Sequence, residues 1–188
     1  MGASVDALKN AVIYYIGMDE MDYSEQQRET GTMYQKIDHI AIAVKDLDEG
    51  IHFFGSVLGF KLTQRRRVQG VRTGMVSAEM EYNDIKFVLC QGTEPESQVS
   101  RLIEHFGPGV AHIALGVDDA EAAAKQLGGK GLKFDTTVIR GSGLRQVFSS
   151  RDANTGLSFE LIERGGEDGF LEENVSELFA QLEKSGAY

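Results

Sequence analysis

Two histidines and one glutamate of this 188-residue chain have the types and spacing of a metal site. His39 and His112 stand at the same place in two similar segments, residues 37–46 and 110–119, and Glu160 stands among apolar residues. An ionised carboxylate in such surroundings is costly to bury unless it is paired or binds a metal. Two neutral imidazoles and one carboxylate form the ligand set of the mononuclear non-haem Fe(II) oxygenases. The sequence therefore predicts a metal ion held between two halves of one domain.

The pattern of each histidine segment predicts a strand with one roomy face. Alternate residues of a strand share a face, and both histidines alternate with small side chains, while larger aliphatic residues fill the other face. Small side chains leave space for a cavity. The predicted cavity face carries Ile37, His39, Ala41 and Ala43 in the first segment and Val110, His112, Ala114 and Gly116 in the second.

The repeat also predicts where a fourth ligand would stand. Residues 87–89 match residues 159–161, so Val88 occupies the position of Glu160 in the first copy, and its side chain cannot coordinate. Four protein ligands would suit an isomerase that needs a Lewis acid. Three leave positions for a bidentate substrate and O₂, which favours an Fe(II) dioxygenase; the same ligands also suit Mn, Co or Ni. A metal-dependent epimerase, isomerase or lyase is the alternative, and a non-catalytic binding module is disfavoured by the intact triad.

Hydrophobic periodicity around these residues predicts the same order of elements twice. The fold class is therefore α+β, with two tandem βαβββ modules forming one open barrel-like sheet around the metal site. The expected elements are a strand at 37–44, a helix at 46–58, strands at 60–68, 73–80 and 85–91, a linking helix at 96–106, a strand at 110–117, a helix at 119–127, and strands at 133–139, 145–150 and 157–163.

This order of elements divides the chain into five parts. They are an N-terminal helix and loop (1–35), the first module (36–92), a linking helix (93–109), the second module (110–164) and a C-terminal lid helix (165–188). The lid helix carries an apolar stripe, which needs a surface to cover.

Composition limits the partners. The net charge of −10 argues against a nucleic-acid surface, which needs a basic patch. No apolar run is long enough to cross a bilayer. The first residues lack a basic stretch followed by an apolar one, so we expect no secretory signal. Cys90 is the single cysteine, so it forms no disulfide within the chain, and the cytoplasm is the expected location. The expected partners are a small-molecule substrate and O₂, with a homodimer formed through the N-terminal helix as a further expectation.

The chain resembles the vicinal oxygen chelate superfamily of paired βαβββ modules, also known as the glyoxalase, bleomycin resistance and dioxygenase superfamily. Residues 36–47 resemble methylmalonyl-CoA epimerase, whereas 107–115 and 159–164 resemble the catalytic half of 4-hydroxyphenylpyruvate dioxygenase. The likeness to the dioxygenase extends into the tail, which in that family is a lid helix over the iron. The resemblance implies that His39, His112 and Glu160 are iron ligands.

The same resemblance points to four substrate-binding positions. Gln98 matches a pocket glutamine, Phe170 matches a lid aromatic, Cys90 falls at a substrate-orienting asparagine, and Thr73 falls near a family serine. A second family glutamine, which precedes the metal histidine, is Ala111 here. Because the polar groups that would hold a phenol are largely replaced, the predicted substrate is a small 2-oxo acid or a similar bidentate molecule other than 4-hydroxyphenylpyruvate.

Overall fold

The computed structural model describes residues 33–70, 72–166 and 172–185. Its contacts divide the chain into two units, Met1–Thr32 and Met33–Tyr188, and the architecture below is that of the second. The helix predicted within residues 1–35 lies outside the described residues.

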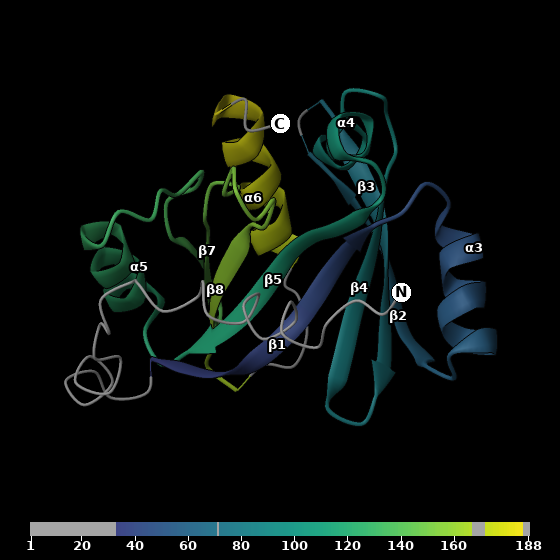
Figure 1. The fold of residues 1–188 in the computed structure, drawn as a ribbon, viewed down its shortest axis with the longest axis horizontal. Coiled ribbons are helices and arrows are strands. Elements are labelled where there is room, and N and C mark those ends of the chain that lie inside the picture. Colours follow the sequence, from purple (N-terminus) through teal and green to yellow (C-terminus); the bar gives the residue numbers. More distant parts are fainter. Residues whose placement is uncertain (1–32, 71, 167–171, 186–188) are drawn as a thin grey trace, which may run out of the picture. The chain divides into compact units, whose positions relative to one another are not determined.

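One mixed eight-stranded sheet forms the framework, in the order β2-β3-β4-β1-β5-β8-β7-β6 (Figure 1). The strands are β1 (Tyr34–Ala43), β2 (Lys61–Gln69), β3 (Gly74–Tyr82), β4 (Ile85–Gly92), β5 (Gly109–Val117), β6 (Ile139–Gly141), β7 (Leu144–Phe148) and β8 (Phe159–Arg164). The sheet curls into a half-barrel, which confirms the α+β fold class predicted from the sequence.

The sheet consists of two halves with the same internal order. β1 pairs with β4 in parallel, and β5 pairs with β8 in parallel. The first strand of each half therefore lies at the inner edge of that half. β1 and β5 then pair with each other in antiparallel fashion and join the halves at the middle of the sheet. Both histidine segments are therefore neighbours although they lie far apart in the sequence.

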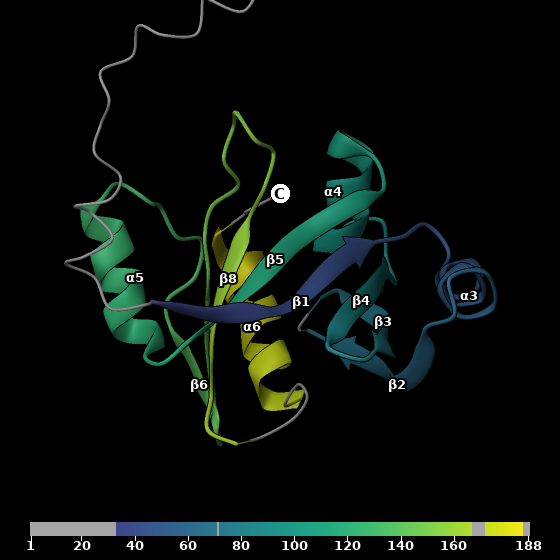
Figure 2. The ribbon, with the colours of Figure 1, turned by 60° about the horizontal axis from the view of Figure 1, so that its bottom comes forward.

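Helices cover both sides of this sheet. They are α3 (Leu47–His52), followed by the π-helical turn η2 (Phe53–Val57), then α4 (Gln98–Phe106), α5 (Ala120–Gly129) and α6 (Glu172–Ser185). Asp46 and Asp119 cap α3 and α5 by accepting hydrogen bonds from backbone N–H groups of the first turn. Figures 1 and 2 show α3 and α5 outside the curl and α6 on its concave side, where it contacts β6 and β2.

Each half has its own hydrophobic core beneath its outer helix. Leu47 of α3 packs with Ala78, Met80 and Leu89, and in the other half Ala120 and Ala123 of α5 pack with Val117, Val147 and Leu161. These cores use the outer face of the sheet. The concave face is therefore left for the cavity, as the small residues beside the histidines predict.

Two β-bulges change the alternation near the histidines. In the pairing of β1 with β5, Asp38 is an extra residue between Ile37 and His39, and Ala111 is an extra residue between Val110 and His112. An extra residue shifts the alternation of the strand. Ile37 and Val110 were expected on the cavity face, but they are 56% and 38% exposed and line no described cavity.

The predictions for two other elements differ from the structure. The helix expected at 46–58 is α for only its first part and ends in the π-helical turn. The strand expected at 133–139 is wrong: Phe134 forms an isolated bridge with Ser149, and β6 starts only at Ile139. Two backbone hydrogen bonds still join the segment to the facing strand, from Asp135 N–H to the Phe148 carbonyl and from Ser150 N–H to the Lys133 carbonyl. The regular ladder is interrupted because Thr136 Oγ1, and not a backbone carbonyl, accepts the hydrogen bond of the Phe148 N–H at 3.0 Å.

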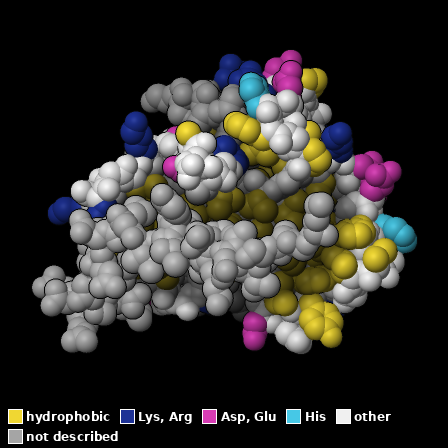
Figure 3. Space-filling model, in the orientation of Figure 1, with side chains coloured by type: hydrophobic (Ala, Val, Ile, Leu, Met, Phe, Trp, Pro, Cys, Tyr) yellow, Lys and Arg dark blue, Asp and Glu magenta, His cyan; other side chains and the backbone are white. Residues whose placement is uncertain are grey.

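The face of the molecule drawn in Figure 3 carries charged groups of both signs and exposed hydrophobic side chains. Figure 3 shows hydrophobic side chains on the right of the view, over α3 and the β3–β4 turn. The exposed large hydrophobic residues nearby are Phe53 and Val57 of η2, Leu58 after it, and Tyr82 and Ile85 at the β3–β4 turn. None of the described helices has both the length and the apolar character that a membrane span requires.

Candidate metal centre

Three neighbouring strands bring the predicted metal ligands together. His39 lies on β1, His112 on β5 and Glu160 on β8. Ala114 of β5 pairs with His39 on one side and with Glu160 on the other, so these three residues form a row across the sheet. His112 stands two residues before Ala114, on the same face. The single methyl group of Ala114 leaves the side chains around it room to converge.

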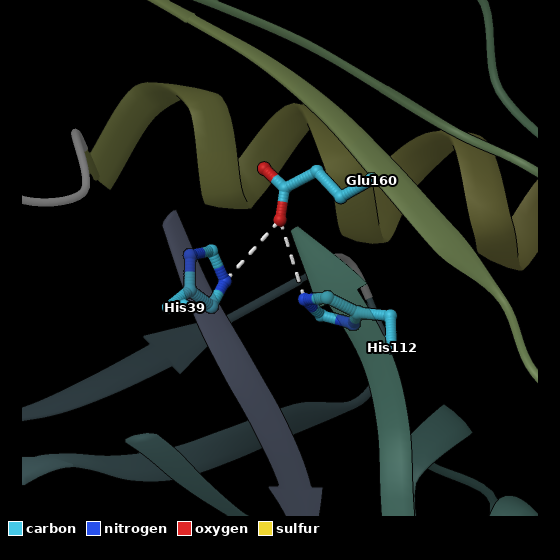
Figure 4. Close-up of side chains that lie close together, drawn as sticks. All are labelled: His39, His112 and Glu160. Atoms are coloured by element: carbon cyan, nitrogen blue, oxygen red, sulfur yellow. Dashed lines mark ion pairs between the residues drawn. The ribbon is translucent and has the colours of Figure 1, made fainter. Parts of the chain in front are cut away.

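The donor atoms of the three side chains face one another (Figure 4). Glu160 Oε2 lies 3.3 Å from Nε2 of His39 and 3.3 Å from Nε2 of His112. The three ligand atoms all lie within 4.8 Å of one another. Two atoms bound to one metal at about 2.1 Å, at the angles of an octahedron or a tetrahedron, lie about 3.0 to 3.4 Å apart. The arrangement therefore fits a single divalent ion.

Glu160 carries the clearest sign that a cation belongs here. Its side chain is 0% exposed, and neither carboxylate oxygen accepts a well-aligned hydrogen bond from the described residues. The contacts of 3.3 Å are longer than the 2.7–2.9 Å expected of a charge-assisted hydrogen bond. A buried carboxylate that lacks such bonds needs a compensating charge, and a divalent ion between the three donors would supply it.

The surroundings shift the pKa values of the two histidines in opposite directions. Burial alone would raise the pKa of Glu160, but the imidazoles of His39 and His112 outweigh burial and lower it to about 2. Burial alone would lower the pKa of His39, but Glu160 and Asp38 outweigh it and raise that pKa. For His112 burial prevails, and the pKa is lowered. His112 is therefore the histidine that is more readily neutral and open for coordination.

The register of the strands also places Val88 as the counterpart of Glu160. Ala41 of β1 pairs with Val88 on one side and His112 on the other, which mirrors the row formed by His39, Ala114 and Glu160. Val88 is 5% exposed and lines the cavity that contains His39, His112 and Glu160. An apolar group thus stands where the symmetry of the fold would place a fourth ligand.

The centre opens into a cavity on the concave side of the sheet. One lobe, of about 470 Å³, contains the His–His–Glu cluster, and a second, of about 640 Å³, extends toward α4 and α6. The two lobes are adjacent and share five lining residues: Met75, Cys90, His112, Phe148 and Leu178.

The positions predicted to bind substrate are distributed unevenly around this cavity. Cys90 lines both lobes, and Gln98, the first residue of α4, lines the second. Thr73 is buried in the turn between β2 and β3 and is not among the residues that line either lobe. Phe170 lies outside the described residues.

Reasoning from the sequence missed two polar residues of the metal lobe. Gln146 of β7 is 1% exposed, and its Oε1 accepts no hydrogen bond from the described residues. Arg66 of β2 reaches the same lobe and forms an ion pair of 3.3 Å with the buried Glu79. Gln146 could have been found from its sequence context, because the residues two positions away on either side, Leu144 and Phe148, are apolar and share its face of the strand.

Comparison with known families places most of this unit in one group. The sequence model of the glyoxalase/bleomycin resistance protein/dioxygenase superfamily matches residues 36–161. The chain is 25% identical to a 4-hydroxyphenylpyruvate dioxygenase from Legionella pneumophila over 96% of its own length, and 27% identical to one from Pseudomonas aeruginosa. It spans 64% and 60% of the lengths of these two relatives.

Solved structures show the same fold. A variant of 4-hydroxymandelate synthase from Streptomyces coelicolor aligns with a TM-score of 0.72 at 21% identity, over 81% of this chain and 55% of its own. Methylmalonyl-CoA epimerase from Mycobacterium tuberculosis aligns with a TM-score of 0.62 at 25% identity, over 72% of this chain and 92% of its own.

Proposed function

This chain belongs to the glyoxalase/bleomycin resistance protein/dioxygenase superfamily, and we propose that it is a mononuclear Fe(II)-dependent dioxygenase of a small 2-oxo acid. The observation that carries the proposal is the set of three donors, His39, His112 and Glu160, opposite an apolar Val88. Three protein ligands leave coordination positions for substrate and O₂. The similarity to 4-hydroxyphenylpyruvate dioxygenases supports the same class of reaction.

A ferrous ion in this site would supply the redox chemistry and the place where substrate and O₂ meet. The overall reaction balances without a further reductant: R–CH₂–CO–COO⁻ and O₂ give R–CH(OH)–COO⁻ and CO₂. Loss of CO₂ and hydroxylation of the neighbouring carbon together provide the four electrons that O₂ takes up. The substrate must therefore present a carboxylate and a keto oxygen together, as a 2-oxo acid does.

The residues of the chain would orient the substrate and keep the site dry. Gln146 lines the metal lobe, and its Oε1 accepts no hydrogen bond from the described residues, so this oxygen could receive one from the substrate. Val88, Phe148 and Met75 give the lobe apolar walls that exclude water. Leu178 of α6 lines both lobes and Leu182 lines the second, so movement of this helix would open the cavity.

Oxygen uptake tests this proposal directly. Purified protein loaded anaerobically with Fe(II) is mixed with a panel of 2-oxo acids that differ in their side chains and include 4-hydroxyphenylpyruvate, and O₂ consumption and CO₂ release are followed. We expect equal amounts of both with at least one small 2-oxo acid, and less with 4-hydroxyphenylpyruvate. Glu160→Gln should abolish the uptake. A metal-loaded protein that consumes no O₂ with any member of the panel would refute the proposal.

A metal-dependent epimerase or isomerase is the second candidate, because the alignment with methylmalonyl-CoA epimerase covers 92% of that enzyme. Such an enzyme would need no O₂ and would work with Co(II), Ni(II) or Mn(II). Exchange of the substrate's acidic C–H proton in deuterated buffer under anaerobic conditions would favour it. Val88, in place of a fourth ligand, supports the dioxygenase instead.

A further inference from the structure

Asp38, the residue before His39, contacts that histidine from behind. Oδ1 of Asp38 lies 3.0 Å from Nδ1 of His39, while Nε2 of the same ring faces Glu160. The side chain of Asp38 is 5% exposed. Adjacent residues of a regular strand point to opposite faces, so a contact between neighbours needs a local cause.

The β-bulge in β1 is this cause. Ile37 pairs with Leu115 and His39 with Ala114, which leaves Asp38 as the additional residue. Bulges next to functional sites re-aim side chains out of strict alternation. Here the bulge allows the carboxylate of Asp38 to lie on the side of the His39 ring.

Arg164 fixes the carboxylate from a third strand. Its Nε donates a hydrogen bond to Oδ2 of Asp38 and its Nη2 donates one to Oδ1, both at 2.8 Å. The side chain of Arg164 is 14% exposed. A two-point arginine–carboxylate pair sets the plane of the carboxylate as well as its distance. β8 thus supplies both Glu160 and the residue that holds Asp38.

We infer that Asp38, clamped by Arg164, is a positioning residue of the metal centre. It accepts the Nδ1 proton of His39, which leaves the Nε2 lone pair directed at Glu160 and the proposed ion. Histidine ligands held in this way keep one tautomer and one ring orientation, and loss of the partner typically weakens metal binding 10- to 100-fold. The inference rests on the metal binding that the proposed function requires.

The second half of the chain provides an internal comparison. Ala111 is the extra residue of the corresponding bulge in β5 and precedes His112, but it carries no carboxylate. A bulge of this kind therefore forms without an acidic residue, so strand geometry alone does not require Asp38. The ring of His112 instead packs edge-on against Phe148, with a centroid distance of 5.2 Å.

Metal binding to the full chain tests the inference. The dissociation constant for Co(II) is measured by competition with a chromophoric chelator, and the visible spectrum of the Co(II) protein reports the geometry of the ligands. We expect Asp38→Asn to weaken Co(II) binding 10- to 100-fold and to change the spectrum. Arg164→Lys keeps the charge but loses the two-point contact. It should weaken Co(II) binding and change the spectrum in the same way as Asp38→Asn, but to a smaller extent.

Two further variants separate positioning from stability. The first variant, Glu163→Gln, changes the residue next to Arg164. The carboxylate of Glu163 pairs with Arg145 outside the cavity, so this variant should leave Co(II) binding unchanged. The double variant Asp38→Asn/Arg164→Gln removes both charges and leaves no unpaired buried ion. It should regain thermal stability relative to Asp38→Asn but keep the weakened affinity and the altered spectrum.

The outcomes distinguish this inference from the proposed function. If the wild-type chain binds Co(II), and both Asp38→Asn and the double variant bind it with wild-type affinity and spectrum, Asp38 and Arg164 are only a structural ion pair and the inference is overturned. If the wild-type chain binds neither Fe(II) nor Co(II), the proposed function fails and the inference fails with it.

Discussion

Glu160 determines what the buried centre can hold. Its carboxylate is fully buried and faces two imidazoles, and the resulting pKa of about 2 keeps it ionised at neutral pH. In the metal-free protein the raised pKa of His39 favours a proton on that ring, which compensates part of this charge. Because metal ligands must be deprotonated, an incoming ion would displace this proton.

Cys90 faces the same cavity, yet we expect it to be chemically inert in the folded protein. Burial raises the pKa of its thiol to about 12, and its side chain is 7% exposed. The thiolate is the reactive form, so almost none is present below about pH 10. Between about pH 7 and pH 9, the alkylation rate of an exposed thiol would rise roughly 20-fold, whereas that of native Cys90 should stay low.

Intact-mass measurement after treatment with iodoacetamide checks this prediction. The same protein in denaturant is the control and should be labelled completely, because unfolding restores an ordinary thiol. Native labelling that follows pH as an exposed thiol does would contradict the buried environment of Cys90. It would also make a nucleophilic role for this residue worth testing.

At the scale of single residues, the sequence predicted the convergence of His39, His112 and Glu160 because repetition and alternation are local patterns. The contact between Asp38 and His39 could not be predicted in this way. It depends on a bulge, which is defined by the pairing of β1 with β5, and on Arg164, which is far away in the sequence. Strict alternation would have placed Asp38 on the opposite face from His39.

At the scale of elements, the attachment of α6 to the β6–β7 hairpin depends on one glycine. Nδ2 of Asn174 in α6 donates a hydrogen bond to the Leu144 carbonyl at 3.2 Å, and Asn174 is 1% exposed. A Cβ atom at Gly141 would lie 1.6 Å from Oδ1 of Asn174. The hairpin therefore has room for this buried side chain only because residue 141 lacks a side chain of its own.

Gly141→Ala should consequently loosen α6 while the sheet stays folded. Displacing Asn174 would remove a buried hydrogen bond, at a cost of about 1–3 kcal/mol. Hydrogen exchange measured by mass spectrometry should show faster exchange in residues 172–185 and unchanged exchange in β1 and β5. Since Leu178 and Leu182 line the cavity, the KM for substrate should rise as well.

Gly129→Ala is the matched control for this variant. A Cβ atom at Gly129, near the end of α5, would meet no heavy atom within 4 Å. Its exchange in α6 should therefore match that of the wild-type chain. If Gly141→Ala also left the exchange of α6 unchanged, Asn174 would not be the contact that holds this helix.

The sequence predicted elements best where they have a regular period. Strands with clear alternation and the two aspartate-capped helices appear close to the expected positions. The π-helical end of the first helix and the broken strand before β6 did not follow from periodicity. In the broken strand, the side chain of Thr136 accepts a hydrogen bond from the Phe148 N–H, and the side chain of Asp135 accepts one from the Ser150 hydroxyl. A hydrophobic pattern does not reveal such side-chain contacts.

At the scale of the whole molecule, the proposed ion would connect the two halves. His39 belongs to the first half, whereas His112 and Glu160 belong to the second, and the β1–β5 pairing is the backbone link between them. The duplication in the sequence predicted this arrangement, because two copies of one module can place equivalent residues on either side of a shared axis. The substrate could not be predicted at this scale, since the polar residues of the cavity do not follow the repeat.

Metal binding should therefore stabilise the whole unit and not only the site. Unfolding separates the three strands that carry the donors, so an ion that binds only the folded state adds stability by mass action. At a free concentration about 100 times the dissociation constant this amounts to about 2.7 kcal/mol, or roughly 5–10 °C in Tm for a domain of this size. Thermal unfolding followed by circular dichroism, with Co(II) or with anaerobic Fe(II), should show the shift, and EDTA should reverse it. Glu160→Gln should show little or no shift under the same conditions. A wild-type Tm that does not respond to either metal would mean that the three side chains do not bind an ion in the folded protein.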